Sequence, residues 1–258
     1  MTSPYDRTDL FDLAGKVALV TGGSRGLGRE MVRAFAAAGA DVVIASRRLP
    51  SCEALAAEVG EKTGRRTLPI ACHVGRWDEI DRMVEAAYAH FGRVDVLVNN
   101  AGMSPLYENV LDVGEELYDK VFAVNLKGPF RLMAQVGTRM AAGDGGSILN
   151  ISSIGAIRTG ADVIPYAAAK AGLNSMTASF AHAFGPTVRV NGIMPGGFFT
   201  DVSAHWDREA FDRHAADTFA LGRGGEPNEI VGAALYFASA ASTYTTGSML
   251  VVDGGVPR

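Results

Sequence analysis

Three residues in the stretch 151–170 have the types and spacing of a proton-transfer site. Tyr166 and Lys170 are four residues apart, so a helix would place both on one face, about one turn from each other. Free tyrosine has a pKa of about 10, too high for a general base near neutral pH, and a neighbouring ammonium favours the phenolate. Ser153 could donate a hydrogen bond to the same substrate oxygen. The trio suits proton exchange with an alcohol or ketone, although a Tyr-Lys pair alone also occurs on ordinary helices.

The segments around this stretch alternate between strand and helix patterns. Short apolar runs predict strands at 16–20, 41–46, within 66–74, and at 94–100, 146–152, 187–195 and 248–255. Helical spacing covers 28–40, 51–64, 76–92, 114–141, a segment starting near Tyr166, and 226–239. Gly128-Pro129 should bend or disturb the helix at 114–141. The alternation predicts an α/β fold, a doubly wound, Rossmann-like parallel sheet with helices on both faces, and a single domain over 1–258.

Residues 196–225 break the alternation with a long, partly polar connection. Such insertions in compact domains often close over a site, so we expect a substrate lid there. The aromatic residues in this segment could instead pack short helices onto the body of the protein. They are Phe198, Phe199, Trp206, Phe211 and Phe219.

Composition and charge exclude several classes of function. The net charge of -4 and the dispersed arginines offer no surface for nucleic acid or for an anionic membrane. Two cysteines cannot build a disulfide framework, and the start of the chain has no apolar signal-peptide core. Apolar runs are shorter than the roughly 18 residues of a membrane span. The five histidines show no metal-ligand spacing. We therefore expect a cytoplasmic protein that needs no metal.

A glycine-rich loop follows the first predicted strand and precedes the first helix. Gly22, Gly26 and Gly28 let the chain turn sharply and bring backbone N–H groups, with the helix N-terminus, against a pyrophosphate. This G-x-x-x-G-x-G spacing differs from the commoner dinucleotide fingerprint, but the physical requirement is the same. The loop residues assigned to a dinucleotide are Gly22, Ser24, Arg25, Gly26, Leu27 and Gly28.

The end of the second strand indicates which dinucleotide binds. NAD sites usually have an acidic residue here for the ribose hydroxyls, whereas arginine accommodates a 2′-phosphate. This strand ends in Ser46-Arg47-Arg48, and Asp41 lies at its other end. Arg25 in the loop adds a second cation on the same side, and guanidinium groups match phosphate oxygens. The pattern favours NADP(H) over NAD(H), unless the exposed arginines are simply solvated.

With these motifs in hand, the chain resembles the short-chain dehydrogenase/reductase family from about Lys16 to Gly255. The resemblance includes Asn99-Asn100-Ala101-Gly102, Asn125, Pro195-Gly196 with Thr200, and the ending Val252-Asp253-Gly254-Gly255. Each motif is short, but their order and spacing together are specific. One departure is His73-Val74, where the family commonly has an aspartate next to the adenine. His73 could stack on or hydrogen-bond the adenine, or only fill the rim of its pocket.

The resemblance implies a role for each matched residue. Tyr166 would exchange the proton, Ser153 would orient the substrate oxygen, and Lys170 would lower the tyrosine pKa and hold the nicotinamide ribose. Asn125 would position a water that links Lys170 to solvent, and Asp95 would brace the central sheet. The remaining residues that the resemblance places at the cofactor are His73, Val74, Asn99, Ala101, Gly102, Pro195, Gly196, Phe198 and Thr200.

The substrate is the least determined part of this interpretation. A pocket for a modest, largely apolar ketone or alcohol could be lined by Met103, Leu106, Ile154, Phe198 and Trp206, while Ser104, His205 and Asp207 leave polar sugars open. Ser153 and Tyr166 would contact the reacting oxygen. The first hypothesis is an NADP(H)-dependent carbonyl reductase or alcohol dehydrogenase acting on a free small molecule. The alternatives are a 3-oxoacyl thioester reductase that uses acyl-carrier protein, and a non-catalytic dinucleotide-binding sensor.

The helix after Lys170 has no Lys or Arg with which to dock an acidic carrier protein, and this makes the thioester reductase the less favoured hypothesis. The resemblance also implies a homotetramer, or a homodimer, built from the long helices and the C-terminal strand. The alanine-rich stretch at 166–172 would permit close helix packing, but it suits an internal core equally well.

Overall fold

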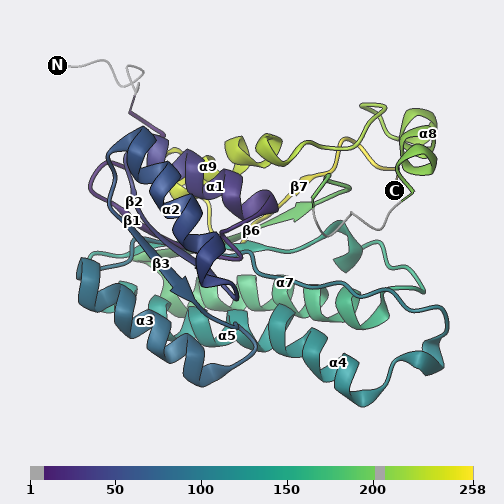
Figure 1. Ribbon diagram of the computed structural model, residues 1–258, viewed down its shortest axis with the longest axis horizontal. Coiled ribbons are helices and arrows are strands. Elements are labelled where there is room, and N and C mark those ends of the chain that lie inside the picture. Colours follow the sequence, from purple (N-terminus) through teal and green to yellow (C-terminus); the bar gives the residue numbers. More distant parts are fainter. Residues whose placement is uncertain (1–8, 201–206, 258) are drawn as a thin grey trace.

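A seven-stranded parallel sheet forms the centre of the computed structural model, which describes residues 9–200 and 207–257 (Figure 1). The strand order is β3-β2-β1-β4-β5-β6-β7, and every pairing is parallel. The strands are β1 (Val17–Thr21), β2 (Asp41–Ser46), β3 (Thr67–Ala71), β4 (Val96–Asn99), β5 (Gly146–Ile151), β6 (Val188–Pro195) and β7 (Met249–Val252). The predicted α/β, Rossmann-like sheet is confirmed.

Helices cover both faces of this sheet. In Figure 1, α1, α2 and α9 lie on one side and α3, α4, α5 and α7 on the other. The helices are α1 (Gly26–Ala37), α2 (Leu49–Thr63), α3 (Trp77–Phe91), α4 (Glu115–Phe122), α5 (Gly128–Leu132), α6 (Thr138–Ala142), α7 (Ile164–Phe184), α8 (Arg208–Thr218) and α9 (Val231–Ala238). A sheet covered in this way needs strands that are apolar on both faces.

The core accordingly consists of two clusters, one on each side of the sheet. Successive residues of β1 alternate between them: Ala18 and Val20 join one cluster, and Val17 and Leu19 join the other. Asp95 connects the central strands, because its Oδ2 accepts the backbone N–H of Val17 at 2.9 Å. The uninterrupted apolar runs of β1 and β4 are therefore explained by their place in the centre of the sheet, where both faces are buried.

The long helical stretch between β4 and β5 is interrupted where the sequence predicted a disturbance. Two π-helical turns, Ala123–Lys127 and Met133–Gly137, separate α4, α5 and α6. The first ends immediately before Gly128-Pro129, and proline has no N–H with which to continue the helical hydrogen bonds. This π-helical turn carries Asn125, so the irregularity lies at a predicted site residue.

The sheet topology locates the ligand site. Strands β2 and β3 lie on one side of β1, and β4 onward lie on the other, so the direction of winding reverses between β1 and β4. Open α/β sheets bind ligands beyond the carboxyl ends of the strands at such a reversal. The glycine loop after β1 and the Asn99–Gly102 turn after β4 both lie there.

Candidate active site

The three predicted catalytic side chains come together beyond the carboxyl end of β5. Ser153 lies just after this strand, and Tyr166 and Lys170 are on the first two turns of α7. Ser153 and Tyr166 approach the same glycine, because a Cβ added to Gly155 would lie 3.3 Å from the Ser153 Oγ and 3.7 Å from a ring carbon of Tyr166. The Lys170 Nζ lies 5.8 Å from the centre of the Tyr166 ring. The predicted grouping is thus present in the structure.

Ser153 is oriented by the short 3-10 helix that follows it, Ile154–Ala156. As the residue before this helix, it has an extended backbone, and its Oγ accepts the N–H of Gly155 at 3.0 Å. A hydroxyl has two acceptor positions and one proton. Accepting from Gly155 therefore fixes the direction of the Ser153 hydroxyl while leaving its proton available for an oxygen beside Tyr166.

The phenol of Tyr166 has a raised pKa, which differs from the lowering expected from a nearby lysine. Burial raises the pKa, because the phenolate would lose its hydration, and the hydrogen bond with Ser153 acts in the opposite direction. Burial is therefore the larger of these two effects in this structure. A phenol that stays protonated at neutral pH is suited to donate a proton to a carbonyl oxygen.

Lys170 is almost fully buried, with 3% of its surface exposed. Its Nζ donates a hydrogen bond to the backbone oxygen of Ile151 at 2.7 Å, which holds the α7 side chain against the end of β5. Burial lowers the pKa of this ammonium to about 8. The group remains mostly cationic at neutral pH and brings a positive charge close to the phenol.

Asn125 is fully buried and fixed to the loop after β4. Its Nδ2 donates to the Met103 oxygen at 2.9 Å, and its Oδ1 accepts the Met103 N–H at 3.2 Å. A Cβ added to Gly102 would lie 3.0 Å from the Asn125 Oδ1 and 3.7 Å from the Lys170 Nζ. Asn125 and Lys170 therefore approach the same glycine, as required if both belong to one site.

The glycine loop is closed by contacts that leave no room for side chains. Gly22 has a φ of 63°, in the left-handed region that favours glycine. A Cβ on Gly28 would lie 2.3 Å from the Gly22 oxygen and 2.5 Å from the Asn100 Nδ2. The first turn of α1 directly follows, with no acidic residue and no side-chain cap from Arg25. Free N–H groups in a tight glycine turn at a helix N-terminus fit a dinucleotide pyrophosphate.

Asn100, which was not among the predicted site residues, holds this loop to β4. Its Nδ2 donates to the Thr21 oxygen at 2.9 Å and to the Gly22 oxygen at 3.2 Å. Asn99 instead points into the core, where its Nδ2 donates to Asn150 at 2.8 Å. Asn99 ends β4 and Asn100 follows it, and successive side chains along an extended chain point to opposite sides, which was the available signal.

The predicted 2′-phosphate region has hydroxyl and guanidinium groups in place. The Ser24 hydroxyl donates to Ser46 at 2.9 Å, which ties the glycine loop to the end of β2. Arg47 and Arg48 are exposed, and neither has an ion-pair partner among the described residues. At the other end of β2, Asp41 is paired with Arg66.

His73 is fixed at the end of β3 by its own neighbours. Its backbone N–H donates to Glu79 at 2.7 Å, and its Nδ1 accepts the N–H of Gly75 at 3.1 Å. With Nδ1 acting as acceptor, the neutral ring carries its proton on Nε2. Where the family commonly has an acceptor carboxylate, this chain therefore has an N–H donor.

Comparison with known proteins assigns the family. The family profile described as "Enoyl-(Acyl carrier protein) reductase" matches residues 22–257. A relative named short chain dehydrogenase/reductase astE, from Aspergillus oryzae, is 37% identical over 251 residues, covering 95% of this chain and 96% of its own. The chain belongs to the short-chain dehydrogenase/reductase family. It is therefore an oxidoreductase by family.

Other members of this family are similar over nearly their whole length. L-rhamnose 1-dehydrogenase (NAD(P)(+)) from Azotobacter vinelandii is 38% identical over 251 residues, covering 95% of this chain and 97% of its own. The solved structure of NADPH-dependent 3-quinuclidinone reductase from Rhodotorula rubra has a TM-score of 0.91 and 32% identity, covering 99% of this chain and 96% of its own. These names describe different substrates on one fold, so the family alone does not specify a substrate.

The segment after β6 is bonded to the C-terminal strand, β7, and to Gly225. The resemblance places this segment at the nicotinamide. Gly196 donates its N–H to Val252 at 2.9 Å, and Phe198 forms a β-bridge with Gly225. The Phe198 ring is only 7% exposed and belongs to a core cluster. Little of Phe198 is therefore accessible to a substrate, because its ring packs in the core beneath the segment.

The predicted substrate residues differ in their exposure to solvent. Met103 is partly buried and packs against the core, Ser104 and Ile154 are partly exposed, and Leu106 is well exposed. Trp206 and His205 lie outside the described residues. In the predicted lid, the rings of Phe199, Phe211 and Phe219 form edge-to-face pairs that hold α8. The aromatic residues therefore pack the segment, and its role as a lid stays a prediction.

Tyr107 is a residue that no sequence pattern indicated. Its hydroxyl donates to the Ala161 oxygen at 2.9 Å and accepts the Ile164 N–H at 2.8 Å. These bonds join the loop after β4 to the segment that leads into α7, two residues before Tyr166. A contact between residues more than fifty positions apart leaves no periodic signal in the sequence.

Within residues 9–200 and 207–257, no group of three or more His, Cys, Asp or Glu side chains has the arrangement of a metal site. Over the same residues, the structure contains no helix that could span a membrane.

Proposed function

We propose that this protein is an NADP(H)-dependent oxidoreductase that interconverts a ketone or aldehyde and an alcohol. The observation that carries the proposal is the meeting of Ser153, Tyr166 and Lys170 beside Asn125 at the carboxyl end of the sheet. Solved relatives that are named as reductases with NADPH, including the L-sorbose reductase from Gluconobacter frateurii, support it at 28% identity and a TM-score of 0.89.

The proposed chemistry uses each side chain at a defined atom. The Tyr166 phenol donates its proton to the carbonyl oxygen during reduction and takes it back during oxidation. The Ser153 hydroxyl donates a hydrogen bond to the same oxygen as charge develops there. Lys170 stabilises the phenolate that remains, and the Asn125 amide holds the loop beside it. A bound nicotinamide supplies or accepts the hydride.

The choice of NADP(H) rests on two observations about the described residues. Arg47 and Arg48 have no acidic partner there, and the end of β2 carries no free carboxylate. A 2′-phosphate would give these guanidinium groups a partner with matching geometry. The hydroxyl of Ser46, which accepts a hydrogen bond from Ser24, holds the glycine loop beside these guanidinium groups.

A titration of the pure protein with NADPH and NADH tests the cofactor proposal. Wild type is expected to bind NADPH more tightly than NADH. The change Arg47→Ala should weaken NADPH binding by about 10- to 150-fold, the equivalent of one charge-assisted hydrogen bond, and leave NADH nearly unchanged. A screen of NADPH-coupled ketone reduction on the same preparation then tests the reaction.

The matched control is Arg82→Ala, which removes an exposed arginine paired with Asp78 on α3. This variant should bind both nucleotides as wild type does. Equal wild-type binding of NADPH and NADH would contradict the NADP(H) assignment. Binding of neither would favour a non-enzymatic function other than the dinucleotide-binding sensor.

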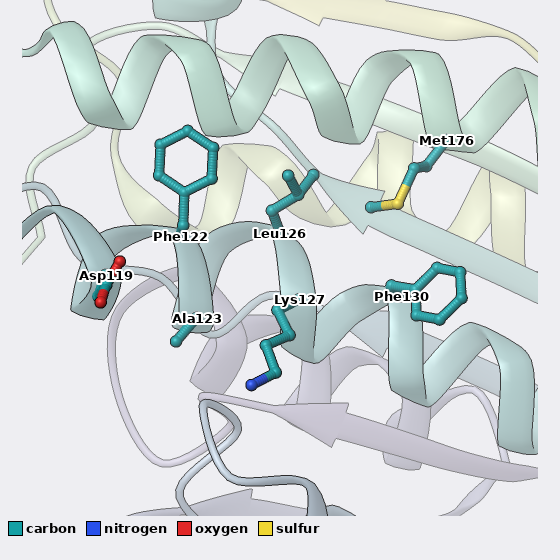
Figure 2. Close-up of a pocket in the computed structure, with 7 residues that line it drawn as sticks. All are labelled: Asp119, Phe122, Ala123, Leu126, Lys127, Phe130 and Met176. Carbon is teal, nitrogen blue, oxygen red and sulfur yellow. The ribbon is translucent and has the colours of Figure 1, made fainter.

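We also propose that the protein is a homotetramer or homodimer, because its long helices expose apolar surface. A pocket between α4, α5 and α7 is lined mainly by apolar side chains (Figure 2). Its lining consists of Asp119, Phe122, Ala123, Leu126, Lys127, Phe130 and Met176. Next to it Tyr118 is 45% exposed, and on β7 Leu250 is 39% exposed. Exposed apolar surface of this kind often marks a protein interface.

Sedimentation of the protein at micromolar concentration tests this assembly. A species of two or four chains is expected, and the change Phe130→Glu should shift it towards smaller species because it places a charge on the apolar face. The matched change Leu111→Glu, at a site that is 91% exposed outside this face, should leave the assembly unchanged. A wild-type monomer would contradict the proposal.

A further inference from the structure

Four segments lie at the same end of the sheet as the catalytic residues and are bonded to one another. Together they are called the rim, defined as residues 103–113, 154–164, 207–225 and 253–257. Tyr107 joins the first segment to the second. Arg158 joins the second to the last through Asp253, at 3.1 Å. Leu221 joins the third to the last, because its N–H donates to the Gly254 oxygen at 2.9 Å. In Figure 1 the rim lies at the right-hand end of the molecule, beyond the carboxyl ends of the strands.

Three of the rim segments expose large apolar side chains. Leu106 is 57% exposed, Ile157 56%, Ile164 47% and Leu221 66%. Isolated exposed apolar residues are ordinary, but these come from different segments that the hydrogen bonds above hold around one site. An apolar substrate body would therefore find contacts around the catalytic residues.

Every lysine or arginine in the described rim is already paired with a carboxylate. The pairs are Arg158–Asp253, Arg208–Asp212, Arg213–Glu209 and Arg223–Glu229. The first pair matters most, because Arg158 is the rim cation nearest in sequence to Ser153. Its partner Asp253 is only 9% exposed on its side chain, so a substrate anion could use Arg158 only by leaving a buried carboxylate without its ion pair.

The acids of the rim are more numerous than these pairs require. Glu108, Asp162 and Asp217 are exposed and have no ion-pair partner among the described residues. Two of them are near the exposed apolar residues in sequence: Glu108 is two positions from Leu106, and Asp162 is two positions from Ile164. The described rim is therefore apolar with an excess of negative charge.

We infer that the site selects neutral or cationic ketones with an apolar body, and discriminates against ketones that carry a carboxylate, a phosphate or an acidic carrier protein. The inference rests on the proposed function and adds its substrate class. Like charges across a binding surface reduce both the rate of encounter and the affinity. A cationic substrate near Glu108 and Asp162 would instead bind faster and more tightly. Discrimination of this kind arises from a repulsive element as much as from an attractive one.

The test compares three acetophenones of similar size whose para side chain, separated from the ring by methylene, ends in a methyl ester, a carboxylate or a primary amine. Reduction is followed with saturating NADPH at low salt. The carboxylate is expected to have a kcat/KM about 10-fold or more below that of the ester, and the amine at least as high as the ester. The differences should shrink at about 0.5 M salt, where charges are screened over a few ångströms.

A double variant assigns the effect to the rim. Glu108→Gln with Asp162→Asn should raise the ratio of kcat/KM for the carboxylate to kcat/KM for the ester about threefold or more. The matched control, Glu53→Gln with Glu61→Gln on α2, removes the same net charge from exposed acids away from the rim. It should leave the ratio of carboxylate to ester at the wild-type value.

The inference is overturned if the carboxylate is reduced as well as the ester at low salt, or if the α2 control moves the ratio as much as the rim variant. If none of the three ketones is reduced, the proposed reaction has failed for this series. The inference is then judged by binding of the same compounds to the protein with NADP+, where equal affinity for the carboxylate and the ester overturns it.

Discussion

Replacing Tyr166 by phenylalanine is expected to lower kcat/KM for ketone reduction by about 10²- to 10⁴-fold, the range for removal of a general acid. The ring and its packing on α7 remain, so NADPH affinity and thermal stability should stay close to wild type. The measurement is steady-state NADPH oxidation with the best ketone of the screen, together with a nucleotide titration of the same variant. A loss of rate without a loss of binding would assign proton transfer to the hydroxyl.

The control for this change is Tyr244→Phe, which removes a hydroxyl from a fully exposed ring outside the site. Its kinetics should match wild type. If Tyr166→Phe kept wild-type activity, proton transfer would have to come from another group. If wild type and variant were both inactive but bound NADPH equally, the non-catalytic sensor interpretation would gain support.

The change Gly28→Ala is expected to disrupt dinucleotide binding. The added methyl carbon would lie 2.3 Å from the Gly22 oxygen and 2.5 Å from the Asn100 side chain, so the loop must open. Overpacking of this kind costs about 1–3 kcal/mol, which corresponds to roughly 5- to 150-fold in NADPH affinity if binding requires the closed loop. Nucleotide titration measures this loss, and thermal unfolding measures how much of the strain also destabilises the protein.

Gly232→Ala provides a matched control, because the added methyl group on α9 would meet nothing within 4 Å. Alanine favours a helix more than glycine does, so this variant should be equal to wild type or more stable by up to about 1 kcal/mol. If Gly28→Ala bound NADPH as wild type does, the close packing of the loop would be irrelevant to the cofactor.

The sheet, its flanking helices and the glycine loop were predictable from local features of the chain. Apolar runs such as 17–21 and 96–99 match strands that are buried on both faces, and helical spacing matches α1, α3 and α7. Gly128-Pro129 indicated the disturbed helix, because proline affects its own hydrogen bonds wherever it lies. The grouping of Ser153, Tyr166 and Lys170 was also predictable, because one strand end and one helix present all three.

Other parts of the site depend on contacts between distant segments. Burial decides the direction of the Tyr166 pKa, and burial is a property of the whole fold. Phe198 belongs to the core although its neighbours form the predicted nicotinamide segment, because a backbone β-bridge pairs it with Gly225 and its ring packs against that glycine. Asn100 holds the glycine loop through bonds that span 78 and 79 residues. None of these could be read from spacing or from residue type.

The sequence by itself determined the fold class, the family and the atoms that could exchange a proton, because these follow from periodicity and from motifs confined to a few residues. Only the tertiary structure decided which charges are free. Arg158 is paired with a carboxylate 95 positions away, whereas Arg47 and Arg48 have no such partner in the part of the chain that the structure describes. An arginine is cationic wherever it lies, but whether it can bind a substrate or a cofactor depends on the groups that the fold brings beside it.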